Sequence, residues 1–98
     1  MSAKLEALEA VYEKVIAIMP NKFDSHEFIL KLAQEHQQRY VQALAEYVDS
    51  EKPFQALHSQ IAMRLLKYPN LINRDGEHIS MNIFLKESIA TVWQKVGK

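Results

Sequence analysis

The chain has 98 residues, of which 48% are hydrophobic and 24% charged, with twelve basic and twelve acidic residues. These values predict one folded domain spanning residues 1–98, and the balanced charge argues against indiscriminate nucleic-acid binding. The absence of cysteine excludes disulfides, thiolate metal sites and a cysteine nucleophile, and two glycines are too few for a phosphate-binding loop or a dinucleotide fingerprint.

The first segment has the apolar spacing of an amphipathic helix, predicted from about Ser2 to Met19. Its apolar side chains recur three and four residues apart and so share one helical face. They are Leu5, Leu8, Tyr12, Val15 and Met19. Ser2 is a suitable N-cap, and Pro20 ends the helix because the residue before a proline avoids the helical conformation. We expect this face in the protein core or, alternatively, in a dimer seam.

The second segment carries the strongest helix-start signal in the chain. Asp24 and Glu27 have the spacing of a capping box, with Asp in place of Ser or Thr. Phe23 and Phe28 flank this start as a hydrophobic staple. The apolar pattern then continues to Val48 across a run of six polar residues. Because no Gly or Pro enforces a break in that run, one long helix is favoured over two shorter helices separated there.

A third helix is predicted from about residue 50 to Tyr68. Asp49 or Ser50 would cap it, and Pro53 fits its first turn. Tyr68 ends it because Pro69 follows. Its buried stripe is Phe54, Leu57, Ile61, Leu65 and Tyr68, and its opposite half carries Gln55, Ser59, Gln60, Met63, Arg64 and Lys67. This segment is therefore an amphipathic helix with a polar, basic outer face.

Asp75-Gly76 lies between two short apolar segments, residues 71–73 and 78–80. Asp and Gly tolerate the positive φ that a tight turn needs, so the pattern predicts either a short β-hairpin or a plain loop. A last helix is then predicted from Ser80 or Asn82 to Val96, with Trp93 as a core anchor. Gly97 is a suitable helix stop. The predicted fold is mainly α, with four or five helices and at most a short hairpin near residues 71–80.

The sequence offers no recognisable enzyme or metal site. His26, His36, His58 and His78 are 10, 22 and 20 residues apart, and none of these spacings is that of a metal-ligand pair. No serine lies in the Gly-rich turn of a nucleophile elbow, and the acidic pairs of the first helix fit a solvated surface. We therefore expect a non-enzymatic protein without a metal or cofactor.

The N-terminal segment has no apolar stretch of the signal-peptide kind. Its longest apolar run, Val15 to Met19, is far shorter than the roughly 20 residues of a membrane span. We expect a cytoplasmic protein without membrane association, and the absence of cysteine agrees with a reducing compartment.

The charged residues are distributed unevenly. Residues 1–51 contain five basic and nine acidic residues, whereas residues 52–74 contain four basic residues and no acidic one. From Phe54 to Ser80, an amphipathic helix with a basic outer face precedes a short apolar segment, the Asp-Gly turn and a second short apolar segment. This order resembles the recognition helix and wing of winged-helix DNA-binding domains.

The resemblance implies that the 54–67 helix lies in the major groove of DNA. It would place Gln55, Ser59, Gln60, Arg64 and Lys67 at the DNA, with Arg74 near the wing. Gln and Arg are suited to reading adenine and guanine edges, while Lys and Ser mostly meet phosphate.

Two functions follow as hypotheses. DNA binding, as a dimer or within a larger assembly, requires Arg64 and Lys67 to be exposed together and a paired hairpin near residues 71–80. The alternative is a helical protein-interaction or adaptor domain without nucleic-acid affinity, which needs no hairpin. In that case the acidic first half and the basic middle could meet the complementary parts of a second copy, or bind another protein.

Overall fold

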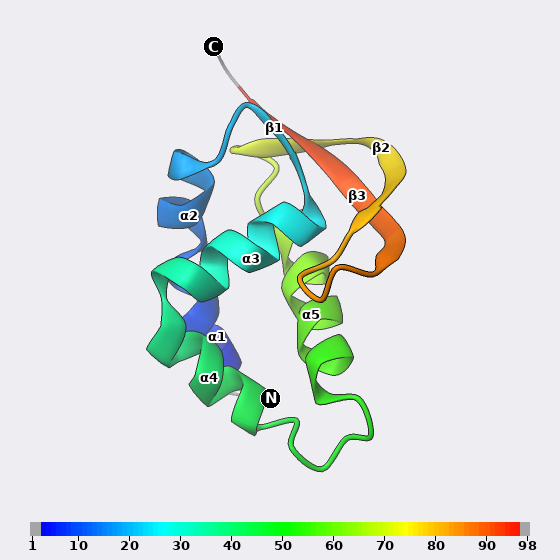
Figure 1. The fold of residues 1–98 in the computed structure, drawn as a ribbon. Coiled ribbons are helices and arrows are strands. Elements are labelled where there is room, and N and C mark those ends of the chain that lie inside the picture. The colour runs from blue at the N-terminus through cyan, green and yellow to red at the C-terminus, as the bar shows by residue number, and fades with distance from the viewer. Residues whose placement is uncertain (1–2, 97–98) are drawn as a thin grey trace.

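The computed structural model describes residues 3–96, which fold into a helical body with an antiparallel sheet at one end (Figure 1). The helices, in chain order, are α1 (Ala3–Glu9), α2 (Tyr12–Ile18), α3 (Ser25–Glu35), α4 (Gln37–Ala45), α5 (Pro53–Arg64) and the short 3-10 helix η1 (Leu65–Lys67). The strands are β1 (Lys22–Asp24), β2 (Ile72–Met81) and β3 (Glu87–Lys95). Within residues 3–96 they form a three-stranded sheet of order β1-β3-β2, so the last strand lies in the middle.

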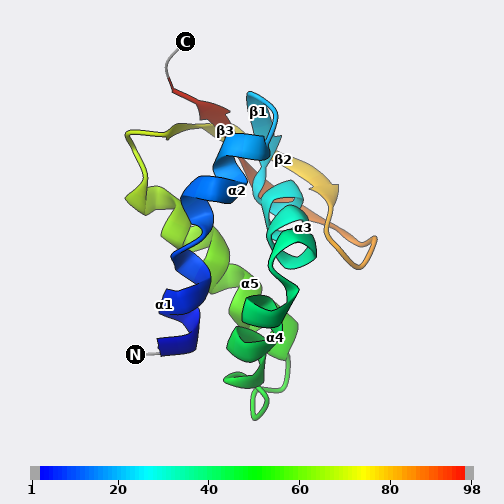
Figure 2. The same ribbon diagram turned by 90° about the vertical axis from the view of Figure 1, so that its left-hand side faces the viewer.

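The helices surround one core and support the sheet through α3. Helix α1 packs against α4, α2 against α3, and α3 against both α5 and β3. Figure 2 shows α1 and α2 in one column, with α4 at the end of the body remote from the sheet. The β2–β3 hairpin therefore extends from the sheet end of the helical body, on the side where α5 lies (Figure 1).

The prediction of a mainly α fold was wrong, because the C-terminal quarter of the chain is a β-hairpin. Residues 80–96, predicted as a helix, form the end of β2, a turn and β3. Their apolar spacing of three and four residues also allows a strand, because Ile89, Thr91 and Val92 are β-branched and suit a pleated surface. Trp93 is nevertheless a core anchor as predicted, since it is buried. The predicted stop at Gly97 and cap at Ser2 lie outside the described residues.

The hairpin is longer than predicted, and its turn lies elsewhere. Asp75-Gly76 does not connect two strands but lies within β2, at an irregularity in the β2–β3 pairing between Arg74 and Glu77, where Gly76 adopts a φ of 100°. The chain reverses at residues 82–86 instead. There the Leu85 amide donates to the Asn82 carbonyl, and the Asn82 side chain accepts from the Phe84 and Lys86 amides. A side chain that bonds its own turn in this way stabilises a reversal without glycine.

The buried face of the first predicted helix is confirmed, but the helix is not continuous. It is divided into α1 and α2 by a turn at residues 10–11. Leu5, Leu8, Tyr12, Val15 and Met19 are all buried, as the spacing predicted. The Tyr12 hydroxyl donates to the Ile61 carbonyl at 2.8 Å, which ties this element to α5. The face thus belongs to the protein core.

The capping box and staple at the start of α3 are confirmed. The Asp24 carboxylate accepts from the Glu27 amide and the Glu27 carboxylate accepts from the Asp24 amide, each at 2.8 Å. The rings of Phe23 and Phe28 stack with centroids 6.2 Å apart.

The prediction of one long helix to Val48 was wrong, because His36 leaves the helical conformation with φ −134° and ψ 59°. The bend lets α3 pack on α2 and β3 while α4 packs on α1.

Helix α5 begins with Pro53 in its first turn, as predicted, and ends as a 3-10 turn before Tyr68. Its N-cap is Lys52 rather than Asp49 or Ser50, and no side chain caps it. The Ser50 hydroxyl instead accepts from the Lys52 amide at 3.1 Å. The start of α5 therefore retains uncapped amide groups, which favour negative charge nearby.

Candidate interaction face on helix α5 and the β2–β3 hairpin

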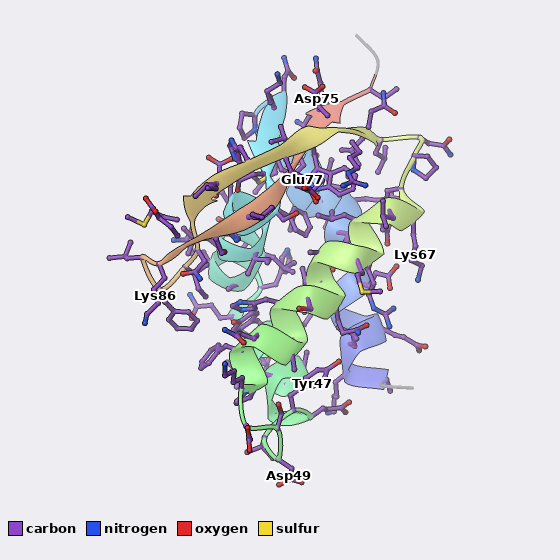
Figure 3. All side chains as sticks on the ribbon, turned by 90° about the vertical axis from the view of Figure 1, so that its right-hand side faces the viewer. Tyr47, Asp49, Lys67, Asp75, Glu77 and Lys86 are labelled. Atoms are coloured by element: carbon purple, nitrogen blue, oxygen red, sulfur yellow. The ribbon has the colours of Figure 1, made fainter. Side chains whose placement is uncertain are left out.

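The six residues predicted at DNA are only partly brought together on one surface. Gln55 and Ser59 are exposed on α5 and Gln60 is half-buried. Arg64 ends α5 at the opposite end, Lys67 lies in η1 beyond it, and Arg74 lies on β2. Figure 3 shows Lys67, just beyond the end of α5, far from Lys86 in the hairpin turn.

Glu9 binds both cations at the end of α5. Its Oε1 lies 2.7 Å from Arg64 Nη1, and its Oε2 lies 3.0 Å from Lys67 Nζ. The Tyr68 hydroxyl also donates to Oε2 at 3.0 Å. The Arg64 side chain is only 17% exposed, so it is not displayed together with Lys67, which is 58% exposed. DNA binding required Arg64 and Lys67 to be exposed together, and this is not observed. We call Glu9, Arg64, Lys67 and Tyr68 the Glu9 cluster.

The charges along β2 are likewise neutralised by neighbours. Arg74 Nη2 lies 2.8 Å from Glu77 Oε2, and Lys22 Nζ lies 3.0 Å from Asp75 Oδ2. The paired hairpin required of a wing is present, because β2 pairs with β3 over most of its length. Its cations near the irregularity are nevertheless matched by acidic side chains, which lowers the attraction to phosphate.

One face of the hairpin is apolar and exposed. Ile79 and Ile89 are direct cross-strand partners and are each 67% exposed. Because side chains alternate along a strand, they lie opposite the face on which Ser80 and Ser88 contact His26. Met81 and Leu85 are also exposed, Leu85 at 77%. We call Ile79, Met81, Leu85 and Ile89 the hairpin face.

Leu85 is held in an unfavourable backbone conformation. Its φ is 64°, in the left-handed region that disfavours a side chain with a Cβ and usually selects Gly or Asn in such turns. A leucine there costs about 1 kcal/mol relative to glycine, yet its side chain has little contact with the domain. An exposed apolar side chain kept at a strained position is typical of a contact with another molecule.

A groove lies between the start of α5, the start of α3 and the hairpin turn. Its volume is about 810 Å³. Phe54, His58 and Phe84 form an aromatic cluster in its wall, with the two phenyl centroids 4.9 Å apart in an edge-on arrangement. Lys52 and Lys86 also line it, as does the carboxylate of Glu51. No hydrogen bond or ion pair is found for either lysine side chain within residues 3–96.

His58 is neutral at physiological pH. Burial lowers its pKa to about 4, with nearby His26 contributing in the same direction. Its Nε2 lies 2.6 Å from the Tyr40 hydroxyl, whose own pKa burial raises to about 12. Both groups are neutral, and the tautomer of His58 sets which of them donates in this hydrogen bond. The other ring nitrogen, Nδ1, has no hydrogen-bond partner among residues 3–96, and His58 lines the groove.

A second polar group joins α3 to the inner face of the hairpin. His26 Nδ1 lies 2.8 Å from Ser80 Oγ, and its Nε2 lies 3.1 Å from Ser88 Oγ. His78 Nε2 lies 2.8 Å from Asp24 Oδ2. Both nitrogens of His26 are thus engaged by serines on paired strands, which orients the hairpin relative to α3.

Acid is expected to destabilise the domain in two stages. Because the folded pKa of His58 is depressed to about 4, the unfolded chain takes up this proton first, and stability falls as pH drops from about 6.5. For Glu9 and Asp24, burial raises the carboxyl pKa, but hydrogen bonds from Arg64 and His78 outweigh it and hold both pKa values below their usual range. Their stabilisation is present above about pH 4 and is lost as pH falls further.

The measurement is the urea midpoint of unfolding from pH 7.5 to pH 2.5. His58→Phe should abolish the stage between pH 6.5 and pH 4 and leave the lower stage. A midpoint that does not change between pH 7 and pH 4.5 in the unsubstituted protein would contradict the assignment of a neutral, buried His58.

Comparison of the chain with protein-family models, with curated proteins and with solved structures gives no match. Over residues 3–96, no cluster of three or more His, Asp or Glu side chains is arranged to hold a metal ion. None of the helices in that range has the length and apolar character needed to cross a membrane.

Most residues of the hairpin face and the groove were missed by sequence reasoning. Phe84 and Ile89 fall on the apolar face of the helix predicted to end at Val96, and Lys86 had no predicted role. The signal that could have found them is Ile89-Ala90-Thr91-Val92-Trp93, a run rich in β-branched and aromatic residues, which favours a strand over a helix.

Proposed function

We propose that this chain is a non-enzymatic protein-interaction domain that binds a partner protein through the β2–β3 hairpin and the adjoining start of α5. The observation that carries the proposal is the exposed apolar hairpin face, with Ile79 and Ile89 each 67% exposed. Contiguous apolar side chains on a surface rimmed by charge are typical of protein interfaces. The absence of cysteine supports a cytoplasmic setting.

The charge distribution supports a protein partner over DNA. The Glu9 cluster engages Arg64 and Lys67, and Glu77 engages Arg74. Each cation neutralised by a carboxylate is a weaker phosphate contact, and phosphate contacts supply most of the non-specific affinity for DNA. An apolar hairpin face would remain in contact with water on DNA but would be buried against a protein.

The test is affinity capture of partners by the tagged protein, followed by binding measurements with the purified partner. Ile79→Ser/Ile89→Ser should weaken binding at least about tenfold, since two buried isoleucine contacts are lost. Leu85→Gly should also weaken binding while preserving or raising stability, because it relieves the positive φ. Val41→Ser, at an exposed valine on α4, is the matched control and should have no effect. Partner affinity unchanged by both hairpin variants would refute the proposal.

Winged-helix-like DNA binding through α5 is the second candidate, favoured by the long β2–β3 hairpin that follows α5 as a wing would. In that case Gln55, Ser59 and Gln60 would contact the DNA, with Lys52 and Lys86 as phosphate contacts. Fluorescent duplex DNA titrated at two salt concentrations tests it, because phosphate binding weakens steeply as salt rises. Salt-dependent binding that Lys52→Ala/Lys86→Ala abolishes would favour this candidate over the first.

A further inference from the structure

The groove beside the hairpin has an apolar wall, and its lining includes Lys52 and Lys86, for which no ion pair is found among residues 3–96. Lys52 lies two residues before Phe54, and Lys86 lies two residues after Phe84, while the two phenyl rings meet edge to face. Each aromatic side chain of the groove thus has a lysine close to it in the chain. The groove is also lined by His58, whose Nε2 is engaged by the Tyr40 hydroxyl.

From this arrangement we propose that the groove binds a short acidic amphipathic segment of the partner protein, with one or two apolar side chains flanked by Asp or Glu. This inference rests on the proposed function, because it names the part of the partner that the same surface holds. The apolar side chains pack on Phe54 and Phe84, and the flanking carboxylates pair with Lys52 and Lys86. The Nδ1 nitrogen of His58 is left for a hydrogen bond to the segment.

The charges within the groove favour this occupant. Glu51 is the one carboxylate among the described lining residues, against two lysines. The uncapped start of α5, which contributes Pro53, Phe54 and Gln55 to the lining, adds a partial positive charge. A single-stranded nucleic acid would need a continuous basic track along its backbone, and the groove has only these two lysines beside an acid.

The groove is also of a suitable size. At about 810 Å³ and open to solvent, it is large enough for more than one side chain. Burying aromatic surface supplies most of the affinity in such sites, while exposed ion pairs mainly supply selectivity. The sign of the ligand's charge is therefore the property that distinguishes this occupant from other apolar peptides.

The experiment uses the full-length, ¹⁵N-labelled protein and three synthetic twelve-residue peptides. The first carries Leu and Phe flanked by Glu, the second has Lys in place of each Glu, and the third has Ser in place of Leu and Phe. We expect the first peptide alone to bind saturably and to shift the amide resonances of Phe54, His58 and Phe84. Lys52→Glu/Lys86→Glu should weaken it about tenfold or more, because two attractions become repulsions. Lys14→Glu, at an exposed lysine on α2 outside the groove, should leave it unchanged.

Several outcomes would overturn the inference. Equal binding of the Lys peptide would show that charge does not select the occupant, and shifts confined to residues outside the groove would show the wrong site. Stronger binding of oligothymidylate than of the acidic peptide would identify a nucleic-acid site. Concentration-dependent dimerisation in sedimentation that Phe84→Ser abolishes would identify a second copy as the occupant. If the acidic peptide fails to bind while Ile79→Ser/Ile89→Ser still abolishes partner binding, this inference fails and the proposed function stands.

Discussion

Replacing Glu9 with alanine is expected to lower the free energy of unfolding by about 2–4 kcal/mol. Glu9 joins α1 to the end of α5 by accepting from Arg64, Lys67 and Tyr68. Without it, the Arg64 guanidinium would stay largely buried without a counter-charge. The Nε of Arg64 is already buried with no hydrogen-bond partner within the described residues. An uncompensated charge of this kind costs more than the loss of a surface ion pair.

Urea denaturation followed by circular dichroism at pH 7 measures this effect. Glu13→Ala, at an exposed position on α2, is the matched control and should change stability by less than about 0.5 kcal/mol. Glu9→Leu/Arg64→Met should recover most of the loss, because it removes both charges and keeps apolar volume. A loss below about 1 kcal/mol for Glu9→Ala would mean that Arg64 reaches solvent when unpaired, and Arg64 would then again be a candidate for DNA contact.

Replacing Trp93 with alanine is expected to cost about 3–5 kcal/mol, a large share of the stability of a domain of this size. Trp93 is only 3% exposed and lies on the central strand, opposite Phe23 of β1 and Arg74 of β2. Its Nε1 donates to Ser25 Oγ at 3.0 Å, which joins the sheet to the start of α3. The substitution therefore removes both core volume and a buried hydrogen bond.

Thermal unfolding should show a fall in Tm of at least about 12 °C for Trp93→Ala. Trp93→Phe should cost about half as much, because it keeps most of the volume and loses the hydrogen bond. Phe84→Ala, at a partly exposed position in the hairpin turn, should have a much smaller effect on Tm. A Tm for Trp93→Ala within about 3 °C of the unsubstituted protein would contradict the role of Trp93 as the link between sheet and helices.

The N-terminal half illustrates what sequence patterns predict well. The capping box of Asp24 and Glu27 and the staple of Phe23 and Phe28 involve residues within one helical turn of one another. The chain alone determines such interactions, because no distant segment has to be placed. The break at His36 has no such local signal. It occurs because α3 and α4 pack on different neighbours, which only the tertiary structure defines.

The prediction of a C-terminal helix was wrong for a related reason. Ile89, Val92, Trp93 and Val96 have spacings that allow either a helix or a strand. The strand prevails because β3 pairs on one side with β1, some seventy residues earlier in the chain, and on the other with β2. Backbone pairing over that separation cannot be read from a local pattern. The Asp75-Gly76 pattern likewise predicted a turn between strands. In the folded protein it lies within β2, at an irregularity in the pairing with β3.

The candidate site was also predictable from the sequence only in part. The sequence by itself determined that residues 54–67 are amphipathic, that Gln55 and Ser59 lie on the outer face, and that residues 52–74 carry cations without an acid, because helical spacing and composition are local properties. Only the tertiary structure decided which of those cations are available. It brought Glu9 from α1 to Arg64 and Lys67, and it placed Phe84 and Lys86 beside Phe54. A surface charge is available for binding only when no neighbour neutralises it, and Glu9 lies 55 residues from Arg64 and 58 residues from Lys67 in the chain.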